Sequence, residues 1–149
     1  MTDPRTNGCR ILVLATLSGG YRGADAAGQS HLDYPPNVYI LPARTSAIFP
    51  PQFYLDSLER GFDAIVVMYS GTDSPYKGES ERTAEIINET YAVMKAKGID
   101  TRRLRLAAIC TVCVRQFLSE IKRMNALLDE IGPIRGRRPA GVSARAEPE

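Results

Sequence analysis

Four short apolar runs are spaced along the chain, at residues 10–15, 38–42, 64–68 and 104–109. They are too short for helices and rich in leucine and β-branched residues, a pattern typical of strands buried on both faces of a parallel sheet. The third run gives way, after Tyr69, to Ser, Gly, Thr, Asp and Pro. This change predicts a polar loop at the carboxyl end of a central strand, where ligands of α/β proteins bind.

The segments between these runs have the features of helices. Four helices are predicted, over residues 24–31, 50–61, 79–97 and 113–131. The helix over residues 79–97 is the clearest, because its apolar side chains recur at helical spacing and Gly98 follows as a stop signal. The helix that begins at Pro50 and Pro51 ends at Gly61, the usual placing of proline and glycine.

The order of elements is therefore βαβαβαβα. Alternation of this kind predicts an α/β fold: one three-layer domain with a four-stranded, mainly parallel sheet. We expect the domain to span residues 9–133, after a flexible leader at residues 1–8. Residues 134–149 are rich in Arg, Pro, Gly and Ala and have little to bury, so a disordered tail is predicted there.

Composition narrows the classes of function. The 149 residues are 44% hydrophobic and 24% charged, with a net charge of +2, which is ordinary for a soluble domain. Several arginines fall in the tail, so a nucleic-acid-binding surface is not indicated. No apolar run has the length of a membrane span, and residues 1–8 lack the apolar core of a signal peptide. A cytoplasmic protein is expected.

Two local motifs suggest chemistry. Residues 16–23 contain three glycines and could cradle a phosphate, but they match neither nucleotide-binding fingerprint, and a simple turn is the favoured interpretation. Cys110 and Cys113 form a CxxC at the start of the last predicted helix, where a redox pair or two buried thiols are both possible. Cys9 is expected at the opposite edge of the sheet, so the three cysteines supply no metal site.

A family resemblance rests on longer stretches. They are Tyr-Arg-Gly-Ala-Asp at residues 21–25, Tyr-Pro-Pro-Asn-Val at 34–38, Glu-Arg-Gly-Phe-Asp-Ala at 59–64 and Gly-Ile-Asp at 98–100. With them the chain resembles, over about residues 10–131, the delta subunit of methyl-viologen-reducing hydrogenase. The resemblance implies a subunit that carries a [2Fe–2S] cluster. Such subunits pass electrons from a hydrogenase or formate dehydrogenase to a flavin-containing heterodisulfide reductase.

The same resemblance places the cluster cysteines in the loops after the first three strands. The matching positions here are Thr16, Gly19, Thr45, Tyr69 and Ser74. None of them has a thiol, and Thr, Gly, Tyr and Ser are not the soft thiolate ligands that iron–sulfur clusters need. The resemblance therefore implies the scaffold, whereas the residues argue that no cluster is bound.

Three hypotheses for the function follow. The first is a non-catalytic subunit of a hydrogenase- or heterodisulfide-reductase-type electron-transfer complex, whose partner is a flavoprotein subunit. The second is a small nucleotide- or flavin-binding domain that uses the loops after strands one and three. The third is a thiol–disulfide protein working through Cys110 and Cys113. Whether the chain catalyses a reaction stays open; on the first hypothesis it does not do so alone.

The first hypothesis makes a structural prediction. The loops at residues 16–22, 42–48 and 69–76 should meet at one edge of the sheet, held together by hydroxyl groups in place of metal ligands. The hydroxyls available are those of Thr16, Ser18, Thr45, Ser46, Ser70, Thr72 and Ser74. Tyr21, Tyr69 and Tyr76 add aromatic surface suited to a partner, so a docking face is expected there.

Overall fold

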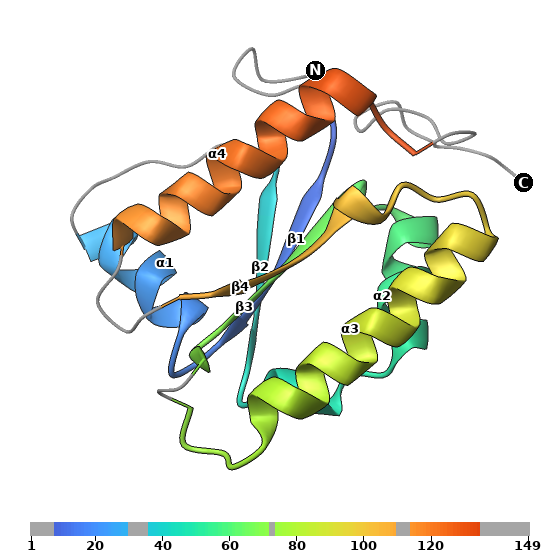
Figure 1. The fold of residues 1–149 in the computed structure, drawn as a ribbon. Helices are drawn as coiled ribbons and strands as arrows, with labels where there is room; N and C mark the ends of the chain where they lie inside the picture. Colours follow the sequence, from blue (N-terminus) through green and yellow to red (C-terminus); the bar gives the residue numbers. More distant parts are fainter. Residues whose placement is uncertain (1–7, 30–35, 72–73, 110–113, 135–149) are drawn as a thin grey trace, which may run out of the picture.

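The computed structural model describes residues 8–29, 36–71, 74–109 and 114–134, and within them it contains one sheet of four parallel strands (Figure 1). The strands are β1 (Ile11–Thr16), β2 (Val38–Ala43), β3 (Ala64–Tyr69) and β4 (Leu104–Ala108). Their order across the sheet is β2-β1-β3-β4, and each neighbouring pair is parallel. The predicted α/β fold is confirmed.

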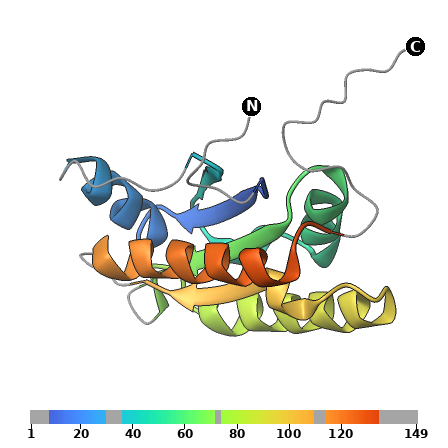
Figure 2. The ribbon, with the colours of Figure 1, turned by 90° about the horizontal axis from the view of Figure 1, so that it is seen from above.

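The helices cover both faces of the sheet, which gives three layers (Figures 1 and 2). They are α1 (Gly20–Gln29), α2 (Pro51–Arg60), α3 (Glu79–Ala96) and α4 (Val114–Ile131), with short 3-10 turns η1 (Ser46–Ile48) and η3 (Thr101–Arg103). One core cluster lies under α1 and α4 and includes Phe117 and Ile121. The other lies under α2 and α3 and includes Leu58 and Ile87.

The two inner strands form the centre of both clusters. All six residues of β1 are buried, as are residues 64–68 of β3, because helices pack on both faces of these strands. Alternate side chains of β1 enter different clusters, so that Val13 contributes to one and Leu14 to the other. The continuous apolar runs in the sequence thus correspond to strands without a solvent-facing side.

The prediction for the first helix was wrong at its start. It was expected from residue 24, after a glycine loop, but α1 begins at Gly20, three residues beyond the end of β1. The reason is steric: Gly19 and Gly20 lie against β3 with no room for a side chain, which lets the chain turn into the helix at once. The second half of the predicted Tyr34-Pro-Pro-Asn-Val segment begins the strand β2 as expected.

Asp63 fixes the edge of the sheet opposite the loops. Its Oδ2 accepts a hydrogen bond from the Arg10 N–H at 2.9 Å, and its Oδ1 accepts one from the Ile134 N–H at 3.1 Å. Its main-chain carbonyl accepts from Arg103 Nη1 at 3.0 Å. One buried carboxylate therefore joins the starts of β1 and β3 to the segment that follows α4.

We predict that Asp63→Asn lowers the free energy of unfolding by about 1–3 kcal/mol, because the new amide nitrogen cannot accept from a main-chain N–H and leaves that buried donor unpaired. Urea denaturation measures the loss. Asp129→Asn, at an exposed position of α4, is the matched control and should change stability by less than about 0.5 kcal/mol. Equal effects of the two substitutions would contradict this role of Asp63.

Candidate functional site at the carboxyl edge of the sheet

The loops that follow β1 and β3 are packed against each other at the carboxyl edge. Ser18 Oγ and Ser70 Oγ share a hydrogen bond of 2.7 Å. The main chain is closer still: a Cβ built on Gly19 would lie 2.7 Å from Ser70 N and 2.9 Å from Thr16 Oγ1. The two loops are therefore in direct contact, with no room between them for a larger group.

Gly20 shows the same constraint one residue further on. A Cβ there would lie 2.4 Å from Met68 Cβ and 3.0 Å from the Met68 carbonyl oxygen, distances that real side chains do not adopt. Glycine is required at residues 19 and 20 for close approach of the backbone to β3. This finding explains the glycine loop by packing, in line with the simpler of the two interpretations of its sequence.

The loop after β2 is held by a different partner, the first residue of α3. The carboxylate of Glu79 accepts hydrogen bonds from the Thr45 hydroxyl and, at 3.1 Å, from the Ser46 N–H. The Ser46 hydroxyl also bonds Thr83 Oγ1 at 2.8 Å. Negative charge is favoured at the N-terminus of a helix, and Glu79 is buried there. This carboxylate thus ties the second loop to the third.

Glu79 was not found from the sequence. It was assigned only as the first residue of the helix, a place where exposed acidic residues are common. The one available signal was its position directly after Gly78, which has a positive φ of 79° and turns the chain sharply into α3. The predicted hydroxyl contacts are nevertheless present for Ser18, Thr45, Ser46, Ser70 and Ser74, the last bonding the main chain of Tyr76.

The five positions assigned as lost cluster ligands separate into two groups. Thr16, Gly19 and Tyr69 lie together at the ends of β1 and β3. Thr45 is instead bonded to Glu79, and Ser74 lies in the turn beside Tyr76. Thr72, Asp73 and the pair Cys110 and Cys113 fall outside the described residues.

The carboxyl edge also has an apolar surface. In the described part of the chain, five large hydrophobic residues are exposed, and four belong to these loops: Leu17, Tyr21, Ile48 and Tyr76. Ile48 is the most exposed, at 67%. Tyr69, which was predicted to contribute to docking, is half-buried. The fifth exposed residue, Tyr39, lies on β2 and contacts Phe62 edge-on.

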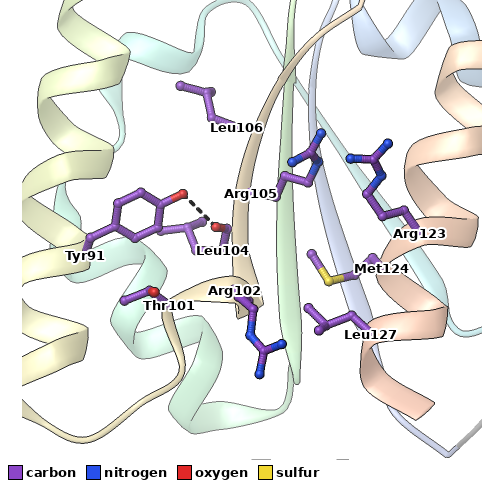
Figure 3. Close-up of a pocket in the computed structure, with 9 residues that line it drawn as sticks. All are labelled: Tyr91, Thr101, Arg102, Leu104, Arg105, Leu106, Arg123, Met124 and Leu127. Carbon is purple, nitrogen blue, oxygen red and sulfur yellow. Dashed lines mark hydrogen bonds between the residues drawn. The ribbon is translucent and has the colours of Figure 1, made fainter. Parts of the chain in front are cut away.

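A second hollow, which the sequence did not indicate, lies along β4. Its volume is about 550 Å³, and α3 and α4 line it on either side of the strand (Figure 3). The hydrogen bond with Glu120 raises the pKa of Arg105, and the one with Arg102 lowers the pKa of Asp100. Burial raises the pKa of Tyr91, whose hydroxyl donates to the Leu104 carbonyl at 2.8 Å.

Comparison with known proteins decides the family. The sequence profile described as "Methyl-viologen-reducing hydrogenase, delta subunit" matches residues 11–132, which is the whole sheet and all four helices. The chain belongs to this delta-subunit family. The resemblance inferred from the short motifs is confirmed. None of the helices in the described residues is long and apolar enough to cross a membrane.

Two kinds of relative match the delta-subunit chain. It is 26% identical over 130 residues to the iron-sulfur subunit of the F420-non-reducing hydrogenase of Archaeoglobus profundus, with 86% of this chain and 94% of that one covered. The vhu iron-sulfur subunit of the F420-non-reducing hydrogenase of Methanocaldococcus jannaschii is 23% identical over 124 residues, covering 83% and 92%. One subunit of the ferredoxin/F(420)H(2)-dependent CoB-CoM heterodisulfide reductase of Methanosarcina acetivorans is 30% identical over 118 residues, which are 76% of this chain but only 14% of the reductase chain.

The residues of this delta-subunit-family chain do not fit an iron–sulfur cluster at the assigned positions. Among the described residues, no three His, Cys, Asp or Glu side chains are grouped so that they could hold a metal ion. Cys9 is buried at the start of β1, at the edge opposite these loops. Position 19 has no space for a thiol-bearing side chain, because its Cβ would meet the Ser70 main chain. Both the donor set and the space are therefore unsuitable.

We predict that Glu79→Ala loosens the loop after β2, because the Ser46 N–H and the Thr45 hydroxyl lose a charged acceptor. The expected loss of stability is about 1.5–3 kcal/mol. Urea denaturation measures it, and amide hydrogen exchange at Ser46 should accelerate. Glu81→Ala removes an exposed carboxylate from the same first turn of α3, so the helix-dipole effect is matched. If Glu81→Ala costs as much, the loop contacts of Glu79 are not the cause.

Proposed function

We propose that the chain is a non-catalytic subunit of a hydrogenase- or heterodisulfide-reductase-type electron-transfer complex, and that it contributes a docking surface and no cluster. The observation that carries the proposal is the carboxyl edge itself. The loops that would surround a cluster are packed on each other through Gly19, Ser18 and Ser70. Their outer surface exposes Leu17, Tyr21, Ile48 and Tyr76.

The partner is proposed from the family. Relatives named as subunits of hydrogenase and of heterodisulfide reductase share this fold region. In the Methanosarcina acetivorans reductase chain the matching region is a small part of a much longer sequence. We therefore propose that the partner is a flavoprotein of the heterodisulfide-reductase type. Exposed tyrosine and isoleucine side chains suit the centre of a protein–protein interface, where aromatic residues are enriched.

The alternative of a nucleotide or flavin site receives less support from this geometry. A phosphate cradle needs main-chain N–H groups that point into free space at a helix N-terminus. At the start of α1 the backbone of Gly19 and Gly20 is instead in contact with β3. The thiol–disulfide hypothesis concerns Cys110 and Cys113, which lie outside the described residues, and it stays a prediction.

The absence of a cluster is tested by reconstitution. We predict that the chain, purified anaerobically and incubated with iron and sulfide, stays colourless and retains only substoichiometric iron, since the assigned positions offer no thiolate. The vhu iron-sulfur subunit of Methanocaldococcus jannaschii, treated in parallel, is the positive control. Stoichiometric iron with a visible charge-transfer band in this chain would overturn the proposal.

The docking face is tested by substitution. We predict that Tyr69→Ala combined with Tyr76→Ala reduces co-purification with the native flavoprotein partner by at least about tenfold, because aromatic side chains at interface centres are often hot spots. Circular dichroism should show the fold intact. Tyr39→Ala is the matched control, since Tyr39 is 46% exposed and Tyr76 43%, but it lies on β2 away from the loops. Undiminished partner binding by the double variant would contradict docking through this face.

A further inference from the structure

The groove along β4 carries an inference that goes beyond the docking face at the carboxyl edge. The nine residues that line it are Tyr91, Thr101, Arg102, Leu104, Arg105, Leu106, Arg123, Met124 and Leu127. They come from α3, η3, β4 and α4, and Figure 3 shows β4 running through the middle with a helix on either side. None of these residues belongs to the three loops discussed above.

The floor of the groove is the outer edge of the sheet. β4 is the last strand, so alternate residues direct their main-chain N–H and C=O away from β3. The Ile109 N–H bonds the Tyr69 carbonyl of β3 at 2.8 Å, which places Arg105 and Ala107 in the inward set. The outward set is therefore Leu104, Leu106 and Ala108.

Parts of this edge are already satisfied. The Leu104 carbonyl accepts from Tyr91, its N–H donates to Thr101, and the Ala108 carbonyl accepts from Gln116 at 2.9 Å. The Leu106 N–H and C=O and the Ala108 N–H have no hydrogen-bond partner within the described residues. Three consecutive main-chain groups thus remain available in the middle of the groove.

The opposite edge of the sheet is different. In β2 the outward set is Val38, Ile40 and Pro42, since the Ala43 carbonyl accepts from the Leu17 N–H of the β1 side. Pro42 has no N–H and blunts this edge against pairing with another strand. β4 contains no proline. Of the two edges, only β4 keeps an uninterrupted pattern of donors and acceptors.

The side chains beside β4 differ between its two faces. Leu104 and Leu106 lie on the face covered by α3, within the second core cluster. Arg105 lies on the other face and pairs with Glu120 of α4 through two hydrogen bonds. A strand added at this edge would alternate in the same way, with one set of side chains beside Leu106 and the other beside Arg105 and Arg123.

Charge selects among possible occupants. The lining includes three arginines and no carboxylate; Arg102 pairs with Asp100 and Glu130, and Arg105 with Glu120. Arg123 has no ion pair within the described residues. Residues 135–149 contain four arginines and two glutamates, and a second copy would present the same arginines, so both are repelled.

We propose that the β4 edge binds an extended acidic segment of a partner protein by strand addition, with alternating apolar and acidic side chains. The main chain of the segment pairs with Leu106 and Ala108. Its apolar side chains pack beside Leu106, and its carboxylates reach Arg123. The partner is thus recognised by backbone pairing together with a two-faced pattern of side chains.

The test uses a synthetic peptide of four Val-Glu repeats with blocked ends, titrated into the ¹⁵N-labelled chain. The Leu106 and Ala108 amides should shift and exchange more slowly with solvent. A peptide with the same residues in two blocks, a Val-Lys repeat, and N-acetylglutamate should each bind at least about fivefold more weakly. If N-acetylglutamate binds as well as the repeat, the groove is a small-anion site and strand addition is wrong.

Two variants sharpen the result. Arg123→Glu should lower the affinity for the Val-Glu repeat by about fivefold or more, and Lys122→Glu, at the neighbouring exposed position outside the lining, by less than about twofold. Leu106→Pro removes an outward N–H, as Pro42 does on β2, and should abolish the amide shifts. If Leu106→Pro unfolds the chain, the arginine–lysine comparison and the wild-type amide shifts decide alone. Equal losses at Arg123 and Lys122, or no shift at Leu106, would overturn the proposal.

Discussion

The contact on which the carboxyl edge depends is the approach of the Gly19–Gly20 backbone to the end of β3. Because a Cβ at either position would collide with Ser70 or Met68, the main chain itself fills the space between β1 and β3. This contact fixes where α1 begins, and it brings Ser18 within hydrogen-bonding distance of Ser70. Such close packing tolerates few changes, since an added methyl group in a dense interior forces the backbone to shift.

The fold followed from the sequence because its signals were local and strong. Residues 64–68 could only be a buried strand, and Pro51 with Gly61 marked both ends of α2. The start of α1 could not be read in the same way. Three glycines in eight residues are typical of a flexible loop, whereas here two of them are required by a contact with a strand some 50 residues away, which no local pattern reveals.

The site was predicted in part for the same reason. The hydroxyl-bearing loops were visible in the sequence, because strand ends in a parallel sheet meet at one edge. Glu79 and the β4 groove were not, since burial of a carboxylate and exposure of a sheet edge depend on which helices cover them. Arg105 shows this well: its partner Glu120 lies on a helix 15 residues later, at a spacing with no local meaning.

The family scaffold can persist without its cluster because other interactions hold the same loops. A structural metal site contributes folding energy through its ligand bonds, so its loss must be offset. Here a charged acceptor at Glu79 anchors the second loop, and the hydroxyls of Ser18 and Ser70 and the glycine contacts join the first and third. Thr16 keeps a side chain of about the size of cysteine, buried at a ligand position, without the soft donor atom. Selection for the position and shape of the edge, independent of electron transfer, accounts for this arrangement, and a docking surface is a function that needs shape alone.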